Sequence, residues 1–155
     1  MRAQDLMTSP AVTCHVNDPL YVAAQKMWDH DCGALVVVND EGRVTGMITD
    51  RDICMAAYTQ ARRLDELLVN GAMAKHVITV GPNRPVSEVE QLMATHRIRR
   101  IPVVDDNETL QGLISLNDLA IEAAQPDTRM KHAAAKIAHT LAAVCRPRIP
   151  RRKVA

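Results

Sequence analysis

The stretch Gly46-Met47-Ile48-Thr49-Asp50-Arg51-Asp52 returns 66 residues later as Gly112-Leu113-Ile114-Ser115-Leu116-Asn117-Asp118. In both copies an apolar run, typical of a buried strand, leads straight into a segment with the spacing of a helix. The pattern Gly-x-x-[Thr/Ser]-x-x-Asp marks the junction. A strand that runs directly into a helix, present twice, predicts two copies of one small unit.

The repetition extends well beyond this stretch. Sliding the chain by 66 residues pairs positions 7–57 with positions 73–123 without a gap, and 14 of the 51 pairs are identical. Random matching at about one position in fifteen would give about three identities. The identical pairs include Met7 with Met73, Pro19 with Pro85, and Asp52 with Asp118.

Both copies predict the same order of elements, βαββα. The first has a strand at 12–14, a helix with Pro19 at its first position, strands at 34–38 and 44–49 around a turn at 39–42, and a helix beginning near Arg51. The second has a strand at 78–80, a helix with Pro85 at its first position, strands at 101–104 and 110–115 around a turn at 105–108, and a helix beginning near Asn117. Proline suits the first position of a helix because its missing N–H has no partner there. Neither unit has enough apolar surface to close a core alone, so we expect the copies to pair.

We therefore predict an α/β (α+β) fold with two pseudo-twofold-related βαββα repeats and a C-terminal helix. The predicted bounds are 1–65, 66–126, 127–145 for the helix, and 146–155 for a tail. Within the helix, one apolar stripe predicts packing on its own domain or on a second subunit. The stripe consists of Met130, Ala133, Ala134, Ile137, Ala138, Leu141 and Val144.

Charge is unevenly distributed along the chain. Residues 146–155 contain five basic residues and no acid, so the net charge of +1 leaves 1 − 5 = −4 for the other 145 residues. Pro147 and Pro150 end helical structure, and we expect the tail to be disordered. Five charges could attract nucleic acid or an acidic partner, but only non-specifically. Nucleic acid is therefore a possible partner rather than the expected one.

The repeated residues resemble CBS domains, named after cystathionine β-synthase, and the tandem is similar to a stand-alone bacterial CBS pair, or Bateman module. The positions that carry the resemblance are Pro19, Met27, 35–40 and 46–52 in the first copy, and Pro85, Met93, 100–105 and 112–118 in the second. The similarity covers about residues 3–124. It implies a non-catalytic regulatory module that binds an adenosine-containing ligand between the repeats and signals to an unidentified protein partner. AMP, ADP or ATP is the first expectation, with S-adenosylmethionine and NAD as alternatives, and the resemblance also implies a homodimer formed through the repeat helices.

The repeated pattern places a hydroxyl and a carboxylate at the start of each second helix. Thr49 and Ser115 sit where a helix N-terminus exposes unpaired N–H groups, which suit a phosphate or a hydroxyl. Asp52 and Asp118 follow one turn later, and a carboxylate can accept hydrogen bonds from two adjacent ribose hydroxyls. The same spacing also fits a capping box, which needs no ligand. Both interpretations can hold together, and the duplicated glycine and the resemblance favour a ligand site.

The second copy adds Arg99 and Arg100 immediately before its buried strand. Their planar guanidinium groups could neutralise a phosphate chain, and in CBS proteins that bind adenine nucleotides the matching positions face the phosphates. A solvated basic loop is the alternative. The first copy has Gly33 and Ala34 at these positions, and Arg51 could substitute there. We therefore expect one competent nucleotide site and one degenerate or differently used cleft.

The resemblance also implies that each cleft is completed by the early strand segment of the other copy. Residues 8–12 would join the site of Asp118, and residues 76–78 would join the site of Asp52. The predicted ligand-binding residues are Val12, Arg99, Arg100, Ser115, Asn117 and Asp118 in the better site, and Thr49, Arg51, Asp52 and Ile78 in the other.

Other function classes have weaker support. The four cysteines lack paired spacing, so we expect reduced thiols and no metal, although Cys14 and Cys32 leave a metal- or redox-responsive stress protein as an alternative. No catalytic triad and no Walker loop is present, so we expect no enzyme. No apolar run approaches the roughly 18 residues of a membrane span, and nothing resembles a signal peptide, so we expect a cytoplasmic protein. The remaining alternative is a dimeric scaffold that acts on nucleic acid through the basic tail.

Overall fold

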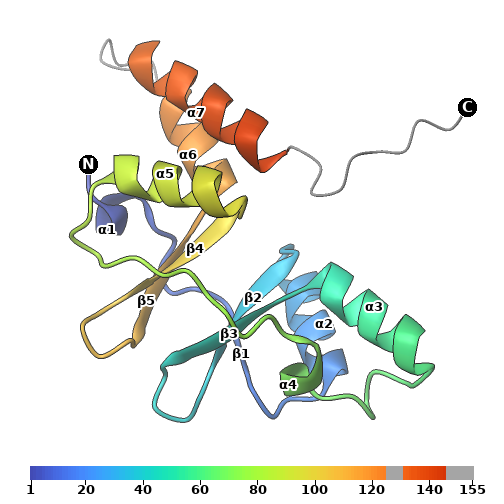
Figure 1. Ribbon diagram of the computed structural model, residues 1–155. Coiled ribbons are helices and arrows are strands. Elements are labelled where there is room, and N and C mark those ends of the chain that lie inside the picture. Colours follow the sequence, from blue (N-terminus) through green and yellow to red (C-terminus); the bar gives the residue numbers. More distant parts are fainter. Residues whose placement is uncertain (125–130, 146–155) are drawn as a thin grey trace, which may run out of the picture.

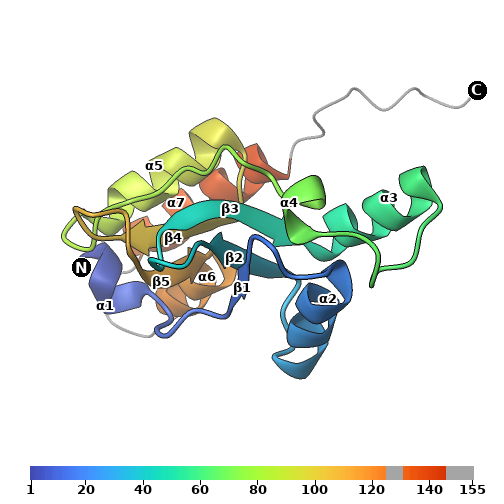
Figure 2. The ribbon, with the colours of Figure 1, turned by 90° about the horizontal axis from the view of Figure 1, so that it is seen from below.

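A computed structural model describes residues 1–124 and 131–145 as two similar α/β repeats with one additional helix (Figure 1). The first repeat contains β1 (Thr13–His15), α2 (Leu20–Asp29), β2 (Ala34–Val38), β3 (Val44–Thr49) and α3 (Asp50–Gln60). The second contains α5 (Val86–His96), β4 (Arg100–Val104), β5 (Leu110–Ser115) and α6 (Leu116–Ala123). Seen from below, the strands of both repeats run through the middle of the molecule, with α2 and α5 on opposite sides (Figure 2).

The two hairpins are built in the same register. β2 pairs antiparallel with β3 from Ala34 opposite Thr49, and β4 pairs antiparallel with β5 from Arg100 opposite Ser115. β2 and β4 are nearly continuous buried runs, whereas β3 and β5 alternate between buried and partly buried residues. Each repeat has its own cluster of buried side chains, with Leu35 and Ile48 at the centre of the first and Ile101 and Ile114 at the centre of the second.

The early strand forms in the first repeat but not in the second. β1 lies parallel to β2, and the N–H of Val36 donates to the carbonyl of Val12. The predicted strand at 78–80 is wrong, because only a single bridge joins Val80 to Val103. The residue that matches Val36 is Pro102, which has no N–H to donate to the carbonyl of Ile78. A proline in the central strand therefore shortens this ladder.

The helix starts differ slightly from those predicted. Pro19 and Pro85 lie just before α2 and α5 in extended backbone rather than at their first positions. Both prolines thus act as caps, and the residue after each begins the helix.

The N-terminal segments of the two repeats are exchanged. The short helix α1 (Ala3–Leu6) packs on the second repeat, where Ala3 belongs to the buried cluster and its N–H donates to the carbonyl of Arg84. The matching helix α4 (Val69–Ala72), 66 residues later, packs on the first repeat, where Val69 is buried. Each repeat therefore completes the core of the other, as expected for units that are too small to close a core alone.

The repeated glycines lie where these exchanged segments cross the hairpins. A Cβ atom on Gly46 would lie 2.6 Å from Sδ of Met73, and one on Gly112 would lie 2.6 Å from Sδ of Met7. The backbones of Met47 and Ala74 also exchange hydrogen bonds, as those of Leu113 and Thr8 do. Close backbone approach thus accounts for both glycines without a ligand.

The pseudo-twofold relation is closed at the hairpin turns. Arg43 and Thr109, which are equivalent positions, form an antiparallel bridge between the two turns. The N–H of Val44 donates to the carbonyl of Glu108, and the N–H of Leu110 donates to the carbonyl of Gly42. The two hairpins are therefore joined end to end through backbone groups.

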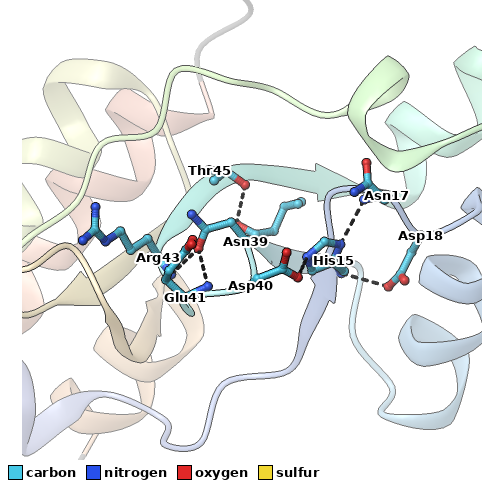
Figure 3. A network of polar contacts seen from close by, with 9 residues as sticks. His15, Asn17, Asp18, Asn39, Asp40, Glu41, Arg43 and Thr45 are labelled. Carbon is cyan, nitrogen blue, oxygen red and sulfur yellow. Dashed lines mark hydrogen bonds and ion pairs between the residues drawn. The ribbon is translucent and has the colours of Figure 1, made fainter.

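A polar network fastens the end of β1 to the turn between β2 and β3 (Figure 3). Nε2 of His15 lies 2.8 Å from Oδ1 of Asp40, and Nδ1 of His15 accepts a hydrogen bond from the N–H of Asn17. Within the turn, Oδ1 of Asn39 accepts from the N–H groups of Glu41 and Arg43. Asp105 accepts from the N–H groups of Asn107 and Thr109 in the same way, but the second repeat has Gly81 at the position of His15, so the contact with Asp40 has no equivalent there.

The last helix, α7 (Lys131–Val144), packs against α5 and α6 of the same chain. Ile137 and Thr140 are buried, whereas Ala138 and Leu141 are exposed. Packing of the stripe on its own chain is confirmed at Ile137 and Val144, and packing of the exposed Ala138 and Leu141 on a second subunit stays a prediction. The basic tail and Met130 lie outside the described residues, as do the side chains of Ala133 and Ala134.

Candidate functional site

A cavity of about 570 Å³ lies between the two repeats, beneath the end of α7. Its walls come from four parts of the chain: the segment before β1, the loop between α2 and β2, the junctions around β4 and α6, and the last turn of α7. The lining residues include six of the predicted site residues, namely Val12, Arg99, Arg100, Ser115, Asn117 and Asp118. The structure therefore brings the whole better site together around one space.

Two local features hold the arginines beside the start of α6. α5 ends with Arg97 in the left-handed region at φ 53°, and the N–H of Ile98 donates back to the carbonyl of Met93. This turn ends the helix and directs the chain into β4. The N–H of Leu116 then donates to the carbonyl of Arg99 at 2.9 Å, which joins the first residue of α6 to the arginine pair.

Ser115 and Asp118 form a complete capping box at the N-terminus of α6. The N–H of Ser115 donates to Oδ2 of Asp118 at 2.7 Å, its hydroxyl donates to the same oxygen at 2.6 Å, and the N–H of Asp118 donates to Oγ of Ser115 at 3.3 Å. These bonds account for the sequence pattern structurally. They use Oδ2 alone, so Oδ1 of Asp118 keeps its acceptor capacity within the part of the chain that the structure describes.

The arginine pair has no counter-charge in contact. Across residues 1–124 and 131–145, the side chains of Arg99 and Arg100 form no hydrogen bond and no ion pair. Arg99 is exposed, but Arg100 is partly buried, and burial together with the neighbouring Arg99 lowers the pKa of its guanidinium, while Asp50 acts in the opposite direction. Two adjacent cations, one of them partly desolvated, favour an anion in this cavity.

Gly33 of the first repeat lies against Asp50 and close to Arg100. A Cβ atom on Gly33 would lie 3.9 Å from Nη2 of Arg100 and 3.1 Å from Oδ2 of Asp50. Gly33 is the residue that matches Arg99, so the loops equivalent by the pseudo-twofold face each other. The first repeat thus contributes Gly33 and Ala34 to the cavity wall where the second contributes Arg99 and Arg100.

The segment before β1 supplies the remaining wall. Thr8 and Leu113 exchange two backbone hydrogen bonds of 2.9 and 3.1 Å, and this places Ala11 and Val12 at the cavity next to β5. The carbonyl of Val12 is occupied by the N–H of Val36. This segment belongs to the first copy and meets the site of the second, as the resemblance implied.

The other predicted site residues do not line this cavity. Thr49 and Asp52 form a capping box with the same geometry at the start of α3, with the Thr49 hydroxyl 2.7 Å from Oδ2 of Asp52. Arg51 is exposed on the first turn of α3, and Ile78 is partly buried. Both repeats therefore have the capping box, but only the box of Ser115 and Asp118 shares a cavity with Arg99 and Arg100.

Several residues of the cavity were not predicted from the sequence. They are His30, Asp31, Cys32, Gly33 and Ala34 from the loop after α2, and Leu141 and Cys145 from α7. The loop could have been inferred from the repeat, since residues 30–34 are equivalent to residues 96–100, which include the predicted Arg99 and Arg100. No pattern in the sequence indicated that the end of α7 reaches this cavity.

The structure argues against Cys14 as a metal or redox group. Cys14 is 1% exposed in the core of the first repeat, and burial, with a smaller contribution from Asp18, raises the pKa of its thiol to about 11. The protonated thiol is a poor metal ligand at neutral pH. Among residues 1–124 and 131–145, no three His, Cys, Asp or Glu side chains are grouped to hold a metal ion.

Comparison with known proteins agrees with this architecture. The family model described as "CBS domain" matches the chain twice, at residues 3–58 and 66–125. This chain belongs to the CBS domain family. The CBS domain-containing protein YhcV of Bacillus subtilis (strain 168) is 38% identical over 118 residues, which cover 76% of this chain and 82% of that protein. The two family matches together take in both repeats of the fold.

Solved structures of CBS domain pairs have the same fold. The pair of protein MJ0100, in complex with 5′-methylthioadenosine and S-adenosyl-L-methionine, has a TM-score of 0.70 at 28% identity and covers 79% of this chain and 94% of that chain. Hypoxic Response Protein I, with two coordinated zinc ions, has a TM-score of 0.72 at 28% identity and covers 81% of this chain and 100% of that chain. In the part of the CBS pair that the structure describes, no helix is long and apolar enough to cross a membrane.

Proposed function

We propose that this CBS pair is a non-catalytic regulatory module that binds an adenine nucleotide in the cavity between its repeats and signals to a protein partner. The observation that carries the proposal is the adjacent pair Arg99 and Arg100, which line the same cavity as Asp118. The guanidinium groups would bind the phosphates, and Oδ1 of Asp118 would accept from the ribose hydroxyls. Val12 and its neighbours would contact the adenine ring.

The adjacent guanidinium groups of Arg99 and Arg100 favour AMP, ADP or ATP over S-adenosylmethionine. The related MJ0100 pair binds S-adenosylmethionine and methylthioadenosine, which supports an adenosine-type ligand. S-adenosylmethionine carries a positive sulfonium, however, and Arg99 and Arg100 would repel it where the phosphates of ATP would be attracted. NAD, with two phosphates, remains compatible with this charge.

A regulatory role requires the ligand to prefer one state of the protein. We propose that this state is a homodimer formed through α2 and α3. α7 packs against α5 and α6, while the first repeat exposes two aromatic side chains, Trp28 at 87% and Tyr58 at 78%. Large exposed aromatics of this kind are typical of an interface. Sedimentation of the wild type and of Trp28→Glu tests this, since the variant should sediment as a monomer.

The nucleotide proposal is tested by a thermal-shift panel of AMP, ADP, ATP, NAD, S-adenosylmethionine and adenosine on the full chain. A ligand at 100 times its dissociation constant stabilises the native state by about 2.7 kcal/mol, which is a readable shift. ATP or ADP should give the largest shift and S-adenosylmethionine the smallest. No shift with any of these compounds would refute the proposal and leave the nucleic-acid alternative, which deletion of residues 146–155 would test.

A further inference from the structure

The helix α7 lies beyond the two matches to the CBS family, which cover residues 3–58 and 66–125. Hypoxic Response Protein I is covered completely by a match that takes in 81% of this chain. The CBS fold can therefore be complete in a protein without the whole of this chain. What α7 adds must come from its own contacts.

α7 is anchored on the second repeat by its inner face. Ile137 is 7% exposed within the buried cluster of that repeat, and Val144 packs against the same cluster. Apolar burial of this kind holds the helix against α5 and α6. Burial of Ile137 and Val144 therefore sets the orientation of the C-terminal end of α7.

The same helix places Leu141 and Cys145 in the wall of the cavity that holds Arg99 and Arg100. The N–H of Cys145 donates to the carbonyl of Leu141 at 2.8 Å, so the helical backbone continues to this wall. Leu141 is 38% exposed and forms part of the cavity wall. A molecule in the cavity would cover this apolar surface.

We propose that α7 is a wall of the ligand cavity, with Leu141 as a positioning and contact residue, so that ligand binding and the docking of α7 stabilise each other. The inference rests on the proposed function, because it concerns the same cavity. Its physical basis is mutual burial: a nucleotide that contacts Leu141 binds more tightly when α7 is docked, and α7 docks more firmly when the nucleotide is present. The helix thereby reports occupancy at the surface of the second repeat.

The test uses the full chain and ATP as the probe. Leu141→Ala should weaken ATP binding about fivefold in calorimetric titration, since roughly three apolar carbons leave a partly covered contact. Leu141→Met should retain the affinity within about twofold, because it preserves the apolar volume. Ile121→Ala is the matched control: Ile121 is an exposed aliphatic on α6, 67% accessible and outside this cavity.

Hydrogen exchange gives a second readout that does not depend on the Leu141 variants. Saturating ATP should slow the exchange of backbone amides 137–145 in the wild type but not in Arg99→Ala/Arg100→Ala. Unchanged exchange in α7, or equal ATP affinity of Leu141→Ala and Ile121→Ala, would overturn the inference while leaving the nucleotide site intact. Failure of the wild type to bind ATP or any other adenosine compound would overturn both proposals.

Discussion

The guanidinium of Arg100, in the second repeat, reaches the backbone of Gly33 in the first: its Nη2 lies 3.9 Å from the point that a Cβ atom of residue 33 would occupy. Because Gly33 is the equivalent of Arg99, the duplication has diverged where the two loops meet. One loop supplies the positive charge, and the other has glycine and alanine at the equivalent positions. The two repeats therefore differ at the interface between them, where one has Arg99 and Arg100 and the other has Gly33 and Ala34.

A carboxylate introduced at residue 33 should compete with the ligand for Arg100. In Gly33→Glu the new side chain lies beside the guanidinium and forms an internal ion pair, so ATP affinity should fall about tenfold. The fold should tolerate the change because Gly33 does not adopt the left-handed region, and the nearest group, the Asp50 carboxylate, is exposed and can turn away. Calorimetric titration with ATP measures the effect.

The control for this prediction is Gly71→Glu. A Cβ atom on Gly71 meets nothing within 4 Å, so this variant adds the same charge at an open position. Equal ATP affinities of the two variants would show that Arg100 does not bind the phosphates.

Removal of either arginine should affect phosphate recognition more than adenosine recognition. Arg99→Gln and Arg100→Gln should each weaken ATP binding about tenfold, as expected for the loss of a charge-assisted contact, while adenosine binding changes less than about twofold. Because Arg100 is partly buried beside Arg99, its replacement should also raise the free energy of unfolding. Arg62→Gln, on the surface of the first repeat, controls for the change in net charge. A parallel loss of ATP and adenosine binding would contradict the assignment.

Ligand binding should protect one of two exposed cysteines. Cys145 lines the cavity, whereas Cys54 is exposed on α3 outside it. Saturating ATP should therefore slow the reaction of Cys145 with N-ethylmaleimide several-fold and leave that of Cys54 unchanged. Peptide mass spectrometry after timed quenching measures both rates in one sample. Protection of both thiols, or of neither, would show that the ligand does not occupy this cavity.

Stability should fall at alkaline pH because of Cys14. Burial raises its pKa to about 11 in the folded protein, from 9.0 for an ordinary thiol. Between these values the unfolded chain releases the proton and the folded chain retains it, so the free energy of unfolding decreases as pH rises through this window and is unaffected below it. Each pKa unit corresponds to about 1.4 kcal/mol.

Urea unfolding at pH 8, 9 and 10 measures this dependence. The decrease should be smaller in Cys14→Ala, which has lower stability at every pH because of the cavity it leaves. Cys54→Ala, at an exposed position, should retain the slope of the wild type. Identical slopes in all three proteins would show that Cys14 ionises as freely in the folded state as in the unfolded one.

The duplication explains why much of the fold was predictable. Strand and helix periods depend on local sequence, and the 66-residue repeat supplied each element twice, so an error at one copy could be checked against the other. The missing strand at 78–80 shows the limit of this reasoning. Pro102 removes one donor from the ladder, and this could have been recognised from the sequence, but the repeat concealed it.

Of the residues that line the cavity, the sequence analysis named Val12 and those from Arg99 to Asp118 with charge, amide or hydroxyl groups, and missed the loop after α2, with His30 and Asp31, and the end of α7. Arg99, Arg100 and Asp118 are conspicuous in the sequence, whereas Gly33 and Leu141 acquire their roles only when the repeats and α7 are packed together. An amphipathic pattern shows that a helix packs, but it does not specify the partner surface. The glycines at 46 and 112 were interpreted in favour of a ligand, and the structure attributes them to the crossing segments instead.

The central claim is that the chain has one competent nucleotide site although it has two equivalent capping boxes. Asp52 and Asp118 make the same three hydrogen bonds in their boxes, so Asp52→Ala and Asp118→Ala should each lower the free energy of unfolding by about 1 kcal/mol. Only Asp118 shares a cavity with the arginine pair. Titration of ATP into the two variants and the wild type is therefore the most direct test. The account predicts at least a tenfold loss of affinity in Asp118→Ala and wild-type affinity in Asp52→Ala, and equal affinities in the two variants would contradict it.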